Sequence, residues 1–184
     1  FKGDDKLLII SQSGTIKTVI PEVTLHLDDQ MIVLEKWIPN KPISAIYFDG
    51  NKDRYFVKRF LAGNQKVEQQ FIPTGSKIQL EMVSSDWKPV IETIFSKTSK
   101  GTKDNLIQNI EELISIKGIK AQGNQLSSNK IKNINLLDPI PYTPPEKTPV
   151  MELEVNDEVD VQNETVLNEE NPINNKEGQT ELEF

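Results

Sequence analysis

The segment Ile43–Phe60, ISAIYFDGNKDRYFVKRF, decides the fold class of this chain. Asp49 and Gly50 separate two runs that are rich in β-branched and aromatic residues. An Asp-Gly dipeptide between two such runs is the strongest local signal for a β-hairpin, because these residues adopt the backbone conformations that tight turns need. The segment therefore predicts two antiparallel strands around a tight turn.

The second strand of this hairpin places its adjacent cations Lys58 and Arg59 on opposite faces. Successive side chains of a strand alternate between the faces of the sheet. Val57 therefore shares one face with Arg59, whereas Phe56 and Phe60 flank Lys58 on the other.

Comparable turn centres recur along the chain at Gly14, Gly50, Asp86 and Gly118, at spacings of 36, 36 and 32 residues. Each marks a predicted hairpin or near-hairpin, so we expect an all-β domain of short strands in a closed or radial arrangement with two to three blades. A closed propeller normally has at least four blades, which leaves an open assembly or blades outside this chain as alternatives. The expected core positions are Ile9, Val19, Val33, Ile46, Val57, Leu80, Ile91 and Ile116.

Three further segments carry specific expectations. Val23–Leu27 alternates strictly between apolar and polar residues, which predicts a strand with His26 on its polar face. Trp37 is expected in the core rather than on a surface that stacks against bases. Residues 105–113 combine helical spacing with strand-like residues, and we interpret them as a short strand or turn.

The charge of the chain is unevenly distributed. Its net charge is −7, but residues 1–144 carry 19 Lys and Arg against 16 Asp and Glu, and residues 145–184 carry 2 against 12. We expect a domain over residues 1–138, a proline-rich linker over 139–150 and a disordered acidic tail over 151–184, because the tail has too few large apolar residues to offset its ordering entropy. A near-neutral domain can still present a basic face to an anionic polymer.

The residue inventory contains no set that indicates catalysis. The chain has no cysteine and one histidine, His26, which argues against a zinc–thiolate centre and a histidine-dependent triad and fits a reducing cytoplasm. No run of apolar residues is long enough for a membrane helix, and no signal-peptide pattern opens the chain. The start at Phe1, without a methionine, suggests a piece of a longer protein.

The clearest candidate binding segment is KGIKAQGNQL, residues 117–126, after the predicted strand Leu113–Ile116. Its cationic and amide side chains surround two glycines, Gly118 and Gly123, that would let the backbone approach a ligand closely. A solubilising surface turn is the simpler interpretation of this segment, since short basic patterns are weak evidence of binding.

This segment, with its neighbour KIKNINLL at residues 130–137 and the N-terminal KLLIISQSGTIK at residues 6–17, resembles the C-terminal region of the DNA-cleaving subunit of bacterial type IIA DNA topoisomerases. It is more similar to the topoisomerase IV form than to the gyrase form, whose box Gln-Arg-Arg-Gly-Gly-Lys-Gly is absent. The resemblance covers about residues 1–140 and implies a β-pinwheel, a propeller-like set of four-stranded blades whose basic rim binds and bends duplex DNA.

The resemblance also implies the partners and the location. They are duplex DNA, the rest of the DNA-cleaving subunit, and the ATPase subunit, in the bacterial cytoplasm, with ATP and magnesium used in other parts of the enzyme and no cofactor in this region. We expect the DNA-facing residues to be Lys117, Lys120, Asn124, Gln125, Lys130, Lys132, Lys17, Lys58 and Arg59. The alternative is a propeller-like module for protein–protein interaction whose lysines are only solubilising.

Overall fold

The structure, a computed structural model, describes residues 2–64, 67–99, 101 and 103–143. The chain divides into two units, Phe1–Pro144 and Pro145–Phe184, and every described residue belongs to the first. The predicted acidic tail and residues 144–150 of the predicted linker lie outside the described residues.

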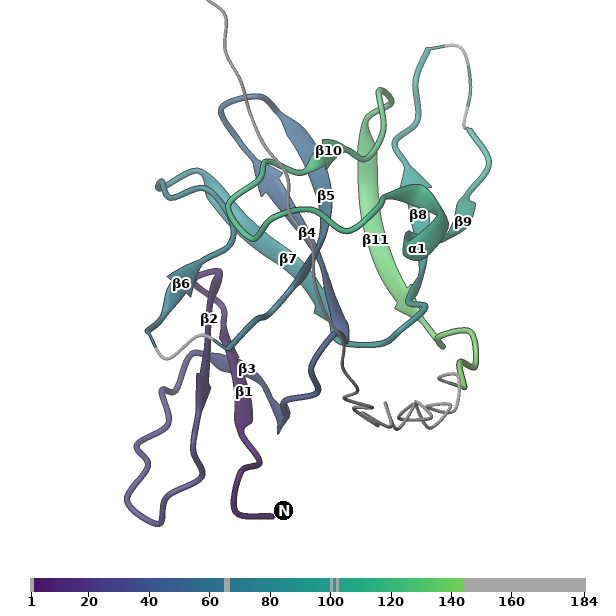
Figure 1. Cartoon of the computed structure of the whole chain (residues 1–184). Helices are drawn as coiled ribbons and strands as arrows, with labels where there is room; N and C mark the ends of the chain where they lie inside the picture. Colours follow the sequence, from purple (N-terminus) through teal and green to yellow (C-terminus); the bar gives the residue numbers. More distant parts are fainter. Residues whose placement is uncertain (1, 65–66, 100, 102, 144–184) are drawn as a thin grey trace, which may run out of the picture. The chain divides into compact units, whose positions relative to one another are not determined.

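Three antiparallel sheets form the first unit, which confirms the all-β fold class and agrees with the expected two to three blades (Figure 1). Sheet 1 has the strand order β3-β1-β2-β6 and contains β1 (Leu7–Ser11), β2 (Thr15–Val19), β3 (Met31–Lys36) and β6 (Gln69–Gln70). Sheet 2 has the order β10-β5-β4-β7 and contains β4 (Pro42–Asp49), β5 (Arg54–Leu61), β7 (Ile78–Ser84) and β10 (Asn124–Gln125). Sheet 3 has the order β11-β8-β9 and contains β8 (Val90–Phe95), β9 (Leu106–Asn109) and β11 (Ile131–Leu137).

Sheets 1 and 2 share one topology. Each has a central hairpin (β1–β2 or β4–β5), a third strand beside the first hairpin strand (β3 or β7), and a two-residue fourth strand beside the second (β6 or β10). The fourth strand comes from the chain that follows the hairpin of the next sheet. Each of these strands is therefore donated to the preceding sheet. Sheet 3 repeats the hairpin and the third strand, but has no fourth strand among the described residues.

The Asp-Gly hairpin forms as predicted. Asp49 pairs with Arg54, and the pairing continues to Pro42 and Leu61 at the other end of the strands. At the first hairpin, Gly14 has a φ of 80°, and a Cβ there would lie 2.2 Å from the side chain of Ile72. Glycine is therefore required at that turn both by its backbone conformation and by lack of space.

The core lies on both faces of sheet 2. One cluster joins it to sheet 1 and includes Ile10, Ile16, Tyr47 and Phe60, all at most 1% exposed. The other joins it to sheet 3 and includes Ile46, Val57, Ile91 and Ile110. Each fully buried side chain of this size stabilises the fold by roughly 1.5–3 kcal/mol relative to an exposed one, so these two clusters hold the three sheets together.

The predicted core positions are mostly correct. Ile9, Ile46, Val57, Leu80 and Ile91 are buried. Val33 and Val19 are half-buried, and Val33 packs against the first cluster. Trp37 packs partly buried against the same cluster, as expected. The prediction is wrong for Ile116, which is 46% exposed, because the chain after Leu113 is irregular and pairs with no strand at that residue.

Two predicted hairpins are absent from the described residues. The turn at Asp86 does not join paired strands, since β7 pairs with β4 in sheet 2 whereas β8 pairs with β9 and β11 in sheet 3. Gly118 is not a hairpin centre either, because Lys117 makes only an isolated bridge to Phe60. The repeat of about 35 residues holds for the first two hairpins, and long-range pairing decides the rest.

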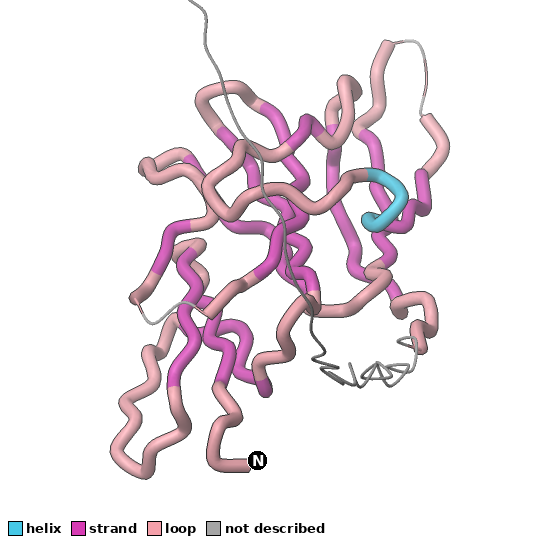
Figure 2. The backbone as a smooth tube through the Cα atoms, in the orientation of Figure 1, coloured by secondary structure: helices cyan, strands magenta, loops and turns pink. Residues whose placement is uncertain are grey.

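Two local predictions also need correction. Val23–Leu27 is not a strand: the chain between β2 and β3 is a loop (Figure 2), and Val23 is fully exposed. The interpretation of residues 105–113 as a short strand or turn is correct for β9 and wrong for the residues after it, which form the one-turn helix α1 (Ile110–Leu113). The Asn109 side chain caps this helix by accepting from the Glu111 N–H.

Candidate nucleic-acid interface

Lys58 lies inside the molecule and does not face a ligand. Its side chain is 2% exposed on the sheet 1 side of β5, beside Phe60, which confirms the predicted alternation but contradicts the predicted DNA contact. The ammonium donates to the backbone carbonyls of Ile119 and Ala121, each at 2.8 Å, and to that of Phe71. All three of its protons have acceptors in the protein, so none is left for a phosphate.

Burial lowers the pKa of Lys58 from 10.5 to about 8 because desolvation disfavours the charged form. The ammonium remains the main form at neutral pH. It acts as a structural cation that connects the segment of residues 117–126 to the core of sheet 2 through the carbonyls of Ile119 and Ala121.

Arg59 points to the other face of β5, toward sheet 3, and is also buried, at 5% exposed. Its Nη2 donates to the Trp87 carbonyl at 2.7 Å and lies 3.9 Å from Glu111 Oε1. Glu111 also pairs with Lys88 at 3.5 Å. Arg59 therefore links β5 to α1 and to the connection before β8, and the predicted DNA contact is wrong for this residue as well.

The segment of residues 117–126 covers the edge of β5. The N–H of Lys117 donates to the Arg59 carbonyl at 2.8 Å, and Asn124 and Gln125 form β10 against Val57 and Phe56. This pairing protects an edge strand from other chains. The exposed side chains of Lys120, Asn124 and Gln125 still face solvent, and the Lys117 ammonium donates to Asn124 Oδ1 at 2.7 Å.

The two glycines of this segment differ. A Cβ at Gly123 would lie 2.7 Å from the Val57 carbonyl oxygen, so glycine there allows close approach to β5 rather than to a ligand. A Cβ at Gly118 would meet no atom within 4 Å. The predicted role of Gly123 is therefore corrected, and the structure shows no local need for glycine at position 118.

The remaining predicted residues are not gathered at one place. Lys17 pairs with Ile9 across β1 and β2 and lies in sheet 1. Lys132 is exposed at an irregularity in β11, in sheet 3. Lys130 is exposed just before β11, with its ammonium 3.8 Å from Asp53.

A cluster of cations that sequence reasoning largely missed lies at one end of sheets 2 and 3. The tip of the β4–β5 hairpin, the start of β7, the end of β8 and the start of β11 meet there, because Asp49 pairs with Ile78 and Phe95 with Ile131. The contact between Lys130 and Asp53 joins the two sheets at this end. We call this cluster the basic end; it consists of Lys52, Arg54, Lys77, Lys97, Lys103 and Lys130, together with Lys120, which lines a groove that also contains Lys52.

The basic end is not purely cationic, since Asp49, Asp53, Glu68 and Asp104 lie among its residues. The other described residues carry 10 Lys and Arg against 12 Asp and Glu, and some of these lysines lie close to carboxylates. Contacts of this kind join Lys36 to Asp5, Lys41 to Glu35 and Lys88 to Glu111. Among the described residues, the excess of cations over acids is therefore larger at the basic end.

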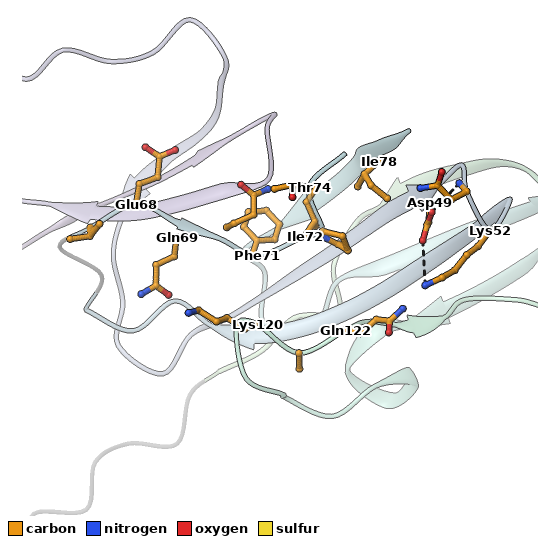
Figure 3. Close-up of a pocket in the computed structure, with 15 residues that line it drawn as sticks. Asp49, Lys52, Glu68, Gln69, Phe71, Ile72, Thr74, Ile78, Lys120 and Gln122 are labelled. Atoms are coloured by element: carbon orange, nitrogen blue, oxygen red, sulfur yellow. Dashed lines mark hydrogen bonds and ion pairs between the residues drawn. The ribbon is translucent and has the colours of Figure 1, made fainter. Parts of the chain in front are cut away.

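A groove of about 870 Å³ opens beside the basic end (Figure 3). One wall is the segment that contains Gln69 and Phe71, and the other carries Lys120 and Gln122. Lys52 stands near its end, 3.4 Å from Asp49. Lys58 holds the two walls together, because its ammonium binds the carbonyl of Phe71 in one wall and that of Ala121 in the other.

The described part of the chain offers neither a metal centre nor a membrane anchor of the helical kind. It holds no group of three or more His, Asp or Glu side chains placed to bind a metal ion. None of its helices is long and apolar enough to cross a membrane. The chemistry available at the basic end is the binding of anions by lysine, arginine and amide groups.

Comparison with known protein families identifies a match. The family described as the topoisomerase C-terminal domain of Bacteroidota matches residues 1–138, three quarters of the chain. No curated protein matches the chain.

Proposed function

Because the chain belongs to the topoisomerase C-terminal domain family of Bacteroidota, we propose that it holds duplex DNA for a type II topoisomerase, as the C-terminal domain of a DNA-cleaving subunit of the topoisomerase IV kind. The proposed partners are duplex DNA, the remainder of that subunit, and the ATPase subunit, in the cytoplasm. Strand cleavage, ATP and magnesium belong to other parts of that enzyme.

The excess of cations at the basic end carries this proposal. Duplex DNA has about one negative charge per 1.7 Å of helix axis, and lysines that neutralise phosphates release condensed counterions. Lys52, Lys120 and Lys130 come from three separate connections. Lys52 and Lys130 lie at one end of sheets 2 and 3, and Lys120 lines the groove that also contains Lys52. A surface of this kind holds the DNA backbone without reading its sequence.

Bending follows from the same contacts. Cations spread along one end of two sheets favour a DNA path that brings more phosphates to them, at a deformation cost of order 1–6 kcal/mol for a site of 20–30 base pairs. The amide side chains of Gln122, Asn124 and Gln125 add uncharged donors beside the lysines.

The test measures how DNA affinity depends on salt as Lys52, Lys120 and Lys130 are changed stepwise to glutamine. Each lost phosphate contact lowers the slope of log K against log salt by about 0.9, so the triple variant should lose about 2.7 of the slope for all sequences alike. Lys2→Gln, an exposed lysine outside the basic end, is the matched control and should change the slope little.

An unchanged slope for the triple variant, with binding still measurable, would reject the basic end as the DNA site. If the 184-residue chain binds a protein partner and not DNA, the alternative of a protein-interaction module replaces the proposal. The groove, which combines amides, both charges and an apolar floor, is the place where such a partner would be sought.

A further inference from the structure

The turn that carries Lys120 has one side toward the core and one toward solvent. The Ala121 N–H donates to the Gly118 carbonyl at 2.9 Å, which closes a β-turn with Ile119 and Lys120 at its two central positions. The Ile119 side chain packs, partly buried, against the cluster shared by sheets 1 and 2. The Lys120 side chain is exposed and lines the groove (Figure 3).

The Lys58 ammonium binds the inner side of this turn. It donates to the carbonyls of Ile119 and Ala121, the residues on either side of Lys120, each at 2.8 Å. Its third hydrogen bond goes to the Phe71 carbonyl in the opposite wall of the groove. One nitrogen atom of β5 therefore holds the backbone around Lys120 and ties it to the other wall.

The position of the turn depends on a cation at residue 58. Taking an ammonium out of water is unfavourable unless other hydrogen bonds replace those to water, and here three carbonyls accept its protons. The Phe60 ring, whose centroid lies 5.2 Å from the ammonium, adds a favourable cation–π contact. An apolar side chain at position 58 would leave the carbonyls of Ile119 and Ala121 without this donor.

The other two lysines on which the proposed function depends are placed by different means. Lys52 lies in the β4–β5 turn, 3.4 Å from Asp49, and the pairing of that hairpin fixes it. Lys130 lies just before β11, whose pairing with β8 places it in sheet 3. Of these three lysines, Lys120 is the one whose neighbours along the chain are bound by Lys58.

We propose that Lys58 positions Lys120 for contact with a DNA phosphate, by holding the carbonyls of Ile119 and Ala121. This inference rests on the proposed DNA site and adds the buried residue that sets its geometry. A turn that is already held in place loses less conformational freedom on binding than a free one, so its contact with a phosphate is stronger. Lys58 itself touches no phosphate, because its protons are bound within the protein.

The test compares single and double variants of the 184-residue chain by the salt dependence of duplex DNA binding. In the wild type, Lys120→Gln should lower the slope of log K against log salt by about 0.9, as one lost phosphate contact does. Lys58→Met should by itself lower the slope by about 0.9, and adding Lys120→Gln to it should change the slope little further. Lys130→Gln is the matched control, because its cost of about 0.9 should be the same with and without Lys58.

The outcomes separate this inference from the proposed function. If Lys52→Gln and Lys130→Gln lower the slope but Lys120→Gln costs the same in both backgrounds, the DNA site stands and the positioning role is wrong. If none of these three changes the slope, the DNA site is rejected and the inference with it. An unchanged slope in folded Lys58→Met also overturns the positioning role, since a purely structural lysine affects stability alone.

A chemical rescue tests whether the ammonium itself is required. The chain has no cysteine, so Lys58→Cys introduces a single thiol. In the unfolded protein 2-bromoethylamine alkylates it, as the thiolate displaces bromide, and rebuilds an ammonium side chain of the length of lysine. After refolding, the slope and the contribution of Lys120 should both return to their wild-type values. A refolded protein that regains neither would contradict the proposal.

A measurement on the wild type covers the case in which Lys58→Met does not fold. The backbone N–H order parameters of residues 119–121 should be about 0.85, the value typical of rigid structure, although these residues lie in a connection between strands. Values below about 0.6 would show that the turn moves freely and would overturn the proposal.

Discussion

The two cations in the middle of β5, Lys58 and Arg59, differ in their surroundings from the exposed lysines of the basic end. Lys58 and Arg59 lie in the middle of a strand that is covered on both faces, and their charged groups bind backbone carbonyls of other segments. Lys52, Lys120 and Lys130 lie in turns and connections and remain exposed. The difference shows that a lysine's neighbours in the fold, rather than its charge, decide whether it is buried as a structural cation or stays exposed to solvent.

Replacing Lys58 should have the largest effect on the stability of the protein. Lys58→Met keeps the length of the side chain but leaves the carbonyls of Phe71, Ile119 and Ala121 without their donor, and each unsatisfied buried group costs roughly 1–3 kcal/mol. We expect the free energy of unfolding to fall by about 3 kcal/mol, with faster amide exchange over residues 118–123. Urea denaturation measures the first effect.

Lys120→Met is the control for that experiment, because it removes a cation of the same segment from an exposed position. Its effect on stability should stay within about 0.5 kcal/mol. If the two variants are equally stable, Lys58 does not anchor the segment.

The two glycines of residues 117–126 differ in the space that surrounds them, and replacing each one tests this difference. Gly123→Ala forces its Cβ against the Val57 carbonyl and should cost about 2 kcal/mol, because backbone must shift to make room. Gly118→Ala meets open space and should be neutral or slightly stabilising. Thermal unfolding of the two variants side by side checks this, and equal midpoints would contradict the close approach of β10 to β5.

The pH dependence of stability distinguishes the buried lysine from the exposed ones. The unfolded chain holds the Lys58 proton up to its ordinary pKa of 10.5, whereas the folded protein releases it near a pKa of about 8. The unfolded state therefore binds more protons between these values, and the free energy of unfolding rises with pH there, by at most about 1.4 kcal/mol per pH unit.

This rise should be measured between pH 7.5 and about 9.5, since burial raises the pKa values of Tyr47 and Tyr55 and their titration begins higher. The contribution of Lys58 is the difference between the wild type and Lys58→Met over this range. Parallel curves for the two proteins would show that the pKa of Lys58 is not lowered.

The smallest expected effect concerns the acidic tail, whose residues lie outside those described. We expect its charge of −10 over residues 145–184, which is tethered to the domain, to compete with DNA phosphates for lysines. Truncation after residue 144 should strengthen DNA binding about threefold at low salt and less as salt screens the charges. Equal binding by both proteins throughout a salt titration would identify the tail as an inert solubilising segment.

Part of the candidate site could be predicted from the sequence. The composition of residues 117–126 indicates a binding segment, and Lys120 does lie at the basic end. Lys52 and Lys77 escape such reasoning because they are single residues in two different connections, which only the pairing of the strands brings to one end. Their position next to predicted turns is the available signal, since turns of neighbouring strands gather at the ends of a sheet.

The burial of Lys58 and Arg59 also has a signal in the sequence. Apolar residues occupy both faces of β5, as Phe56 and Val57 show, and such a strand is covered on both sides. A cation in its middle therefore needs partners inside the protein.

Residue patterns by themselves determined the all-β class, the two hairpins at Gly14 and Gly50, and the alternation within each strand. These properties depend on the conformational preferences of neighbouring residues, which act over short distances along the chain. Tertiary structure alone decided which strands pair, which carbonyls the buried cations bind and which strand-like segment stays unpaired. Lys58 meets Ala121 across 63 residues, β10 joins β5 from a distant connection, and Val23–Leu27 lacks a partner within the described chain. Contacts between segments so far apart depend on how whole sheets pack, and no local pattern encodes them.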